Sequence, residues 1–175
     1  MTRKRYIIGI DEVGRGALAG PVTVGALALQ AGLRFDPAEL KRLKLNLRDS
    51  KKLTPAGRRR WVSYLKKRND IFFKTASVSP KAIDRMNISR AANLAATKAF
   101  EKLADREILK TSPFVFLDGG LYLKNGWGKK LKVRTVIRGD ESIDAVKLAS
   151  IVAKVSRDAL MVRRHEKYPH YGFPK

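Results

Sequence analysis

The sequence contains no cysteine and only two histidines among its 175 residues. Without cysteine, disulfide bonds and thiolate-bound zinc are excluded, and nothing points to an oxidising compartment. Both histidines, His165 and His170, lie near the C-terminus, so an imidazole-rich metal site is also disfavoured. Any metal site in this chain is therefore expected to use oxygen ligands.

Long apolar runs are missing as well. The start of the chain, MTRKRYIIGI, has the basic and then apolar character of a secretory signal, but Asp11, Glu12 and Arg15 interrupt it. No stretch approaches the roughly 18 uninterrupted apolar residues of a membrane-spanning helix. We therefore expect a cytoplasmic protein without a membrane partner.

Acidic residues are scarce: 16 Asp and Glu stand against 38 Lys and Arg, which gives a formal net charge of +22. The positive residues are spread along the chain rather than gathered in one tail. Such a charge favours a polyanionic partner, and nucleic acid is the commonest one. A ribosome-associated or simply very soluble basic protein would have the same composition, so charge alone leaves these alternatives open.

Hydrophobic patterning predicts strands and helices along the whole chain. Apolar and β-branched runs predict strands, the first two forming a hairpin, over residues 6–10, 22–29, 71–78, 114–117 and 131–137. N-cap residues and helical spacing predict helices that begin near Pro37, span 55–67, lie around Ile83, span 87–104 and run from about 142 or 145 to 165. This order predicts an α/β fold in one domain over residues 1–175, with a mixed sheet flanked by helices.

The positions of the few acids are informative. Asp11 and Glu12, Asp118, and Asp140 each follow a predicted apolar strand. If these strands share a sheet, the carboxylates converge at one edge, and such a cluster is the ligand set that Mg²⁺ or Mn²⁺ prefers. Two such ions roughly 4 Å apart activate a water and stabilise the leaving oxygen in phosphodiester hydrolysis. The constellation therefore predicts a metal site in a protein that attracts polyanions.

Two alternatives explain the same residues without a metal. Each acid taken separately is an ordinary turn former at a strand end, and Asp118 before glycine alone favours that interpretation. Gly14, Gly16 and Gly20 after a strand also approach a dinucleotide-binding loop. The acid pair that would face a pyrophosphate, and the strand that follows Pro21 in place of a helix, disfavour the dinucleotide interpretation.

Several blocks of the sequence resemble a known family. They are GIDEVGRGALAGPV, LRDSKKLTP, MNISRAANLAATKAF, FLDGG and GDESIDAVKLASIVAKVSRDALM. In this order they resemble the type 2 ribonucleases H, and specifically bacterial ribonuclease HII, across nearly the whole chain. The family pattern continues after YPxYGF with His-Lys-Gly-Tyr, a segment that is not in this sequence, which ends at Pro174-Lys175.

The resemblance implies a ribonuclease H-like fold and a monomeric endoribonuclease. Its substrates would be RNA/DNA hybrids and duplex DNA containing ribonucleotides, and its products would carry a 5′-phosphate and a 3′-hydroxyl. It implies that Mn²⁺ or Mg²⁺ is required, with two ions when substrate is bound. The metal-binding catalytic residues would be Asp11, Glu12, Asp118 and Asp140.

The resemblance also implies substrate-binding residues. Gly14, Arg15 and Gly16 would contact the nucleotides at the RNA to DNA junction, where the 2′-hydroxyl distinguishes RNA from DNA. Ser50 and Lys51 would lie near the scissile phosphate. The alternative is a turn with a surface arginine and a solvated lysine ahead of a helix.

Basic residues also recur along one side of the last predicted helix, at Lys147, Lys154, Arg157 and Arg164. Their spacing fits a phosphate track, but a solvated helix face is the interpretation we favour. In the same helix, Asp158 is expected to be an ion-paired or buried structural acid. A non-catalytic nucleic-acid-binding member of the family remains the alternative to an enzyme.

Overall fold

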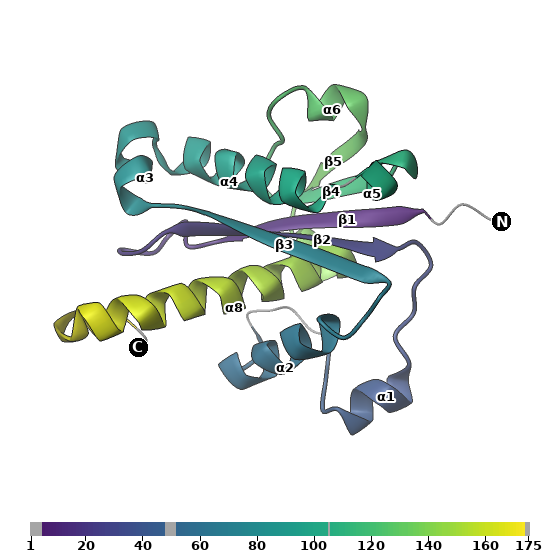
Figure 1. Cartoon of the computed structure of the whole chain (residues 1–175), viewed down its shortest axis with the longest axis horizontal. Helices are drawn as coiled ribbons and strands as arrows, with labels where there is room; N and C mark the ends of the chain where they lie inside the picture. The colour runs from purple at the N-terminus through teal and green to yellow at the C-terminus, as the bar shows by residue number, and fades with distance from the viewer. Residues whose placement is uncertain (1–4, 48–51, 105, 174–175) are drawn as a thin grey trace.

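The computed structural model describes residues 5–47, 52–104 and 106–173 (Figure 1). Its centre is a five-stranded sheet with the order β3-β2-β1-β4-β5. The strands are β1 (Tyr6–Val13), β2 (Val22–Gln30), β3 (Ile71–Val78), β4 (Phe114–Asp118) and β5 (Lys132–Val136). Strands β1, β2 and β3 pair antiparallel, whereas β4 is parallel to both β1 and β5.

The helices follow the predicted order, with three short additions. They are α1 (Pro37–Arg42), α2 (Pro55–Leu65), α3 (Pro80–Met86), α4 (Ile88–Leu103), α5 (Arg106–Lys110), α6 (Trp127–Lys130), α7 (Gly139–Ser142) and α8 (Asp144–Lys167), before a 3-10 turn at Pro169–Tyr171. Helices α5, α6 and α7 were not predicted, because four or five residues are too few to show helical periodicity. Among the described residues, no helix is long and apolar enough to cross a bilayer.

Helix starts are set by short polar side chains, as the sequence predicts. Thr54 accepts a hydrogen bond from Gly57 N (3.1 Å) at the start of α2, and Asp36 and Ser79 cap α1 and α3 in the same way. Each of these three caps precedes a proline, whose fixed φ suits the first helical turn. The positions of α1 to α3 in the chain are thus fixed locally.

Helices cover both faces of the sheet. In Figure 1, α3 and α4 lie over one face and α8 crosses the other, with α2 packed against α8 on its far side. Alternation along β1 divides the two cores: Ile8 and Ile10 pack in the α4 core, whereas Ile7 packs in the core shared by α8 and α2. The predicted α/β fold, a mixed sheet flanked by helices, is confirmed.

Glycine brings α8 unusually close to the sheet. A Cβ atom on Gly9 would lie 2.1 Å from the carbonyl carbon of Ala145, and one on Gly25 would lie 2.4 Å from Ala149 O. Any side chain at these two positions would push the helix away from the sheet. Glycine in β1 and β2 therefore allows α8 to pack directly against both strands. The later turns of α8 are thereby carried to the edge of the sheet where β1 ends.

Candidate metal centre at the edge of the sheet

Neighbouring strands bring the predicted acids together. In the parallel pair of β1 and β4, Ile10 is the register partner of Leu117, so Asp11 and Asp118 follow side by side. The prediction that β1 ends before Asp11 was wrong: β1 runs to Val13 because its pairing with β2 continues to that residue. Asp118 is the last residue of β4, close to its predicted position at the strand end.

Three of the four acids form a tight cluster. Carboxylate oxygens of Asp11, Glu12 and Asp118 lie within 4.8 Å of one another. They line a cavity of about 330 Å³ whose walls are Asp11, Glu12, Val13, Gly14, Arg15, Asp118, Asp140 and Lys154. The structure therefore brings together all four acids named from the sequence and two residues of the Gly-Arg-Gly loop.

Asp140 reaches this cavity from a different kind of element. It lies in the first turn of α7 and is 3% exposed. Arg138, just before the helix, has a left-handed backbone with φ of 54°, which turns the chain from β5 into α7. Asp140 lines the cavity but is outside the group of three whose oxygens lie within 4.8 Å.

Backbone amides orient two of the carboxylates. Asp11 Oδ1 accepts a hydrogen bond from Glu12 N at 2.7 Å, and Asp118 Oδ1 accepts one from Gly139 N at 2.6 Å. The second bond joins the end of β4 to the start of α7, the helix that carries Asp140. The strand end and the short helix are therefore held in one arrangement around the cavity.

Helix α8 supplies two polar residues that the sequence interpretation did not assign to the site. Ser150 is fully buried and hydrogen-bonds to the Asp11 carboxylate, an interaction that lowers the pKa of Asp11. Lys154 lines the cavity, and its Nζ donates to Ser150 Oγ at 3.0 Å. Lys154 was named from the sequence only as part of the basic stripe, and the i, i+4 spacing of Ser150 and Lys154 is also that of any solvated helix face.

Burial dominates the electrostatics of the cluster. Burial is the largest cause of a rise in the pKa of Asp11 to about 7; the charges of Glu12 and Asp118 add to the rise, and the hydrogen bond from Ser150 opposes it. Burial likewise raises the pKa of Glu12, and the nearby Arg15 guanidinium opposes that rise. Ionised carboxylates are costly in this place without a cation.

The residues present fit a hard divalent cation. Glu12 Oε2 is buried and has no hydrogen-bond partner within the described part of the chain. Such an orphaned acceptor, in a cavity shared by four carboxylates, is the arrangement expected of a ligand for Mg²⁺ or Mn²⁺. Neither histidine lines this cavity, consistent with an all-oxygen site.

The Gly-Arg-Gly loop forms part of the rim. Arg15 Nη1 lies 3.4 Å from Glu12 Oε1, and its side chain is 35% exposed. Gly14 lines the cavity, whereas Gly16 is exposed. The predicted substrate-binding residues Ser50 and Lys51 lie outside the described residues.

The basic stripe on α8 is not simply a solvated face. That preference was wrong for Lys154, which lines the cavity, and for Arg157, whose guanidinium donates two hydrogen bonds to backbone carbonyls. Asp158 is ion-paired as expected, with Arg58 of α2 at 3.2 Å, but its side chain is 49% exposed rather than buried.

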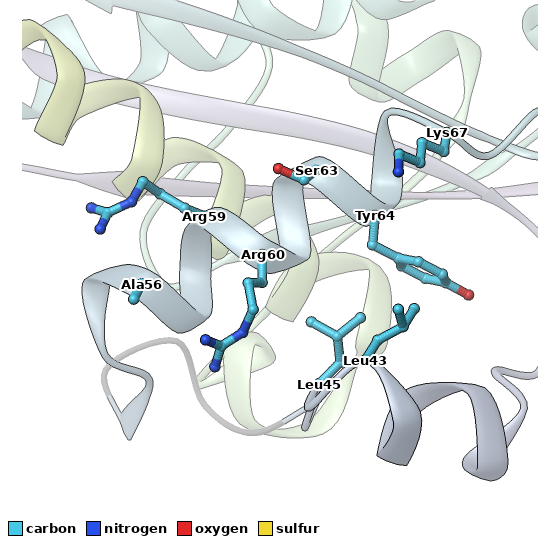
Figure 2. Close-up of a pocket in the computed structure, with 8 residues that line it drawn as sticks. All are labelled: Leu43, Leu45, Ala56, Arg59, Arg60, Ser63, Tyr64 and Lys67. Atoms are coloured by element: carbon cyan, nitrogen blue, oxygen red, sulfur yellow. The ribbon is translucent and has the colours of Figure 1, made fainter.

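A second cavity lies away from the acids. Its volume is about 470 Å³, and it is lined by Leu43, Leu45, Ala56, Arg59, Arg60, Ser63, Tyr64 and Lys67 (Figure 2). In Figure 2, Leu43, Leu45 and Tyr64 lie together between α2 and the end of α1. None of the described residues that line it is Asp or Glu, so it has no ligand set for a hard cation.

The chain is similar in sequence to known proteins along nearly its whole length. The family model for "Ribonuclease HII" matches residues 8–175. Ribonuclease HII of Chlamydia caviae is 38% identical over 169 residues, covering 97% of this chain and 71% of that protein. Ribonuclease HII of Caldicellulosiruptor bescii is also 38% identical, over 172 residues that cover 98% of this chain and 74% of that protein.

Solved structures show the same fold. The structure of the PCNA:RNase HII complex from Archaeoglobus fulgidus matches with a TM-score of 0.65 at 26% identity, over 92% of this chain and 76% of that one. Ribonuclease H2 from Pyrococcus horikoshii matches with a TM-score of 0.66 at 24% identity, over 93% of this chain and 77% of that one. The mixed sheet and its flanking helices are therefore those of ribonuclease H proteins.

Proposed function

The chain belongs to the ribonuclease HII family, and we propose that it is a metal-dependent endoribonuclease with one catalytic domain over residues 1–175. It hydrolyses the RNA strand of RNA/DNA hybrids and ribonucleotides embedded in duplex DNA, leaving a 5′-phosphate and a 3′-hydroxyl. The observation that supports this best is the cluster of Asp11, Glu12 and Asp118 oxygens within 4.8 Å of one another, on a chain of net charge +22. The basic surface attracts the duplex and the acidic cavity cuts it.

Asp11, Glu12, Asp118 and Asp140 would hold Mn²⁺ or Mg²⁺, two ions when the substrate is bound. When bound, such ions supply an activated water and stabilise the charge on the leaving oxygen. The chain's own contribution is orientation. The amide of Glu12 and the hydroxyl of Ser150 fix the Asp11 carboxylate, while the amide of Gly139 fixes that of Asp118.

The rim of the cavity would recognise the substrate. Gly14, Arg15 and Gly16 follow the acid pair after one intervening residue, Val13, so a strand that enters the cavity passes the loop. The glycine backbone lets a sugar approach closely, and the exposed Arg15 suits a phosphate or a 2′-hydroxyl. Ser50 and Lys51 would contact the phosphate at the cut.

The same proposal includes the setting in which the enzyme acts. It would work as a cytoplasmic monomer, because the resemblance to bacterial ribonuclease HII implies both. Its task would be to remove RNA primers or misincorporated ribonucleotides during DNA replication and repair.

A cleavage assay tests the proposed function. With Mn²⁺ and a duplex containing ribonucleotides, Asp118→Asn is expected to lower the rate by at least about 100-fold, since it removes a charge from the reacting centre. Asp158→Asn makes the same chemical change outside the cavity, at the exposed pair with Arg58, and is expected to leave the rate nearly unchanged.

Two results would overturn the proposal. Equal cleavage by the unmutated chain and Asp118→Asn would remove the assignment of the metal site. If neither protein cuts while the unmutated chain still binds hybrids, the chain is a nucleic-acid-binding member of the family rather than an enzyme.

A further inference from the structure

The loop that carries Arg15 has little packing of its own. It joins β1 to β2 between Val13 and Val22, and residues 15–19 are all exposed. Leu18 at its tip is as exposed as in an isolated peptide, at 107%. An exposed loop without a packed side chain needs an outside contact if it is to keep one conformation.

Arg157 of α8 supplies that contact. Its Nε donates to Pro21 O at 3.0 Å, and its Nη2 donates to Ala19 O at 2.7 Å. The planar guanidinium thus joins two carbonyls at the returning end of the loop in a forked geometry that no other side chain offers. Arg157 lies three residues after Lys154, so the same helix lines the cavity and contacts the loop.

The loop is also shaped around this side chain. Gly14 has φ of +99°, and a Cβ atom there would lie 2.6 Å from Arg157 Nε and 2.7 Å from Pro21 O. The space that a side chain at position 14 would occupy is therefore filled by the arginine and by the returning strand. Glycine at position 14 and arginine at position 157 specify the loop jointly.

We propose that Arg157 is a positioning residue: it holds the loop so that Arg15 stays at the rim of the carboxylate cavity, and it acts on substrate selection without touching the substrate. This inference rests on the proposed role of the Gly-Arg-Gly loop. In the competing interpretation, the guanidinium of Arg157 binds a phosphate of the duplex directly. In the structure its Nε and Nη2 instead face backbone carbonyls, and the side chain is partly buried.

A double-mutant cycle separates the two roles. The rate constant kcat/KM is measured for a DNA duplex with one ribonucleotide, for Arg15→Ala, Arg157→Ala and the double variant. We expect each single change to lower kcat/KM by about tenfold, the effect of roughly one net hydrogen bond, and the double change to lower it by about tenfold as well. A double variant that loses about 100-fold, the product of the two, would overturn the positioning role.

A conservative variant gives an independent readout. Arg157→Lys keeps the positive charge but cannot reach both carbonyls with a planar fork, so we expect it to be nearly as impaired as Arg157→Ala. Recovery of full kcat/KM by Lys would show that charge alone matters and would overturn the proposal. Arg163→Ala, which removes an exposed charge from the same helix, is the control and is expected to retain cleavage within about twofold.

Hydrogen exchange shows the loop directly. For Arg157→Ala and Arg157→Lys we expect faster amide exchange in residues 14–20, with exchange in β4 and α4 unchanged. Unchanged exchange in the loop would contradict the proposal, and if Arg157→Ala does not fold, Arg157→Lys decides alone. If Arg15→Ala itself cleaves normally, the proposed role of the loop fails. If it is impaired but independent of Arg157, only the positioning role fails.

Discussion

Replacing Asp11 by asparagine is expected to stabilise the metal-free protein at pH 8, although it should abolish cleavage. The unfolded carboxyl titrates near a pKa of about 3.9. In the folded chain, burial and the neighbouring acids raise the pKa of Asp11 to about 7. At pH values between these two pKa values, the Asp11 carboxyl keeps its proton in the folded state but has released it in the unfolded state. Stability therefore falls as pH rises from about 4 to 7, and the loss is complete above pH 7.

The structure sets the size of the effect. A difference of about 3 between the two pKa values corresponds to about 4 kcal/mol of unfolding free energy at pH 8. The hydrogen bond from Ser150 to the ionised carboxylate already lowers that pKa, so this difference includes its contribution. We therefore expect a gain of about 4 kcal/mol at pH 8 and of about 1–2 kcal/mol at pH 5.

Urea unfolding in the presence of a chelator measures this gain at both pH values. Asp70→Asn is the matched control, because Asp70 makes a bidentate ion pair with Arg68 (2.8 and 2.6 Å) and is not part of the acid cluster. The same chemical change there is expected to destabilise the protein by up to about 1 kcal/mol. An Asp11→Asn variant that is no more stable than the unmutated chain at pH 8, or whose gain is the same at pH 5, would refute the reasoning.

Three further predictions concern packing, metal binding and the duplex. Gly9→Ala is expected to lower the free energy of unfolding, measured in urea, by about 3 kcal/mol or more, because its methyl group would overlap the backbone of Ala145. Gly16→Ala has open space around it and should lower that free energy by less than about 1 kcal/mol. Ser150→Ala should weaken Mn²⁺ binding about tenfold in titration calorimetry, since it frees the Asp11 carboxylate, and unchanged affinity would contradict that role. Affinity for a duplex should fall steeply and linearly in a plot of log K against log salt, and a flat plot would count against phosphate contacts.

Most of the fold could be predicted from the sequence because its signals are local. Strand β3 begins and ends as predicted, and the N-caps at Thr54 and Ser79 mark where α2 and α3 begin. The end of β1 was placed too early, since an acid pair after an apolar run is typical of a strand end. Pairing with β2 overrides that tendency and carries Asp11 and Glu12 into the strand.

The acids of the site were also accessible from the sequence, because carboxylates beside apolar strands are rare and need a reason. The residues of α8 that lie beside these acids could not be assigned to the site from the sequence. Ser150, Lys154 and Arg157 look like one polar face of a long helix. That this face meets the acids depends on the close approach of α8 at Gly9, which is a tertiary contact. Helical spacing predicts which residues share a face of the helix, but it does not predict what that face contacts.

The chemical nature of the product ends tests the central claim most directly. A DNA duplex with a single ribonucleotide is cleaved by the unmutated chain with Mn²⁺, and the fragments are analysed by mass spectrometry. If carboxylate-bound ions activate a water, one fragment carries a 5′-phosphate and the other an intact 3′-hydroxyl, and Asp118→Asn yields neither. A 2′,3′-cyclic phosphate would mean that the 2′-hydroxyl is the nucleophile, and it would contradict the account.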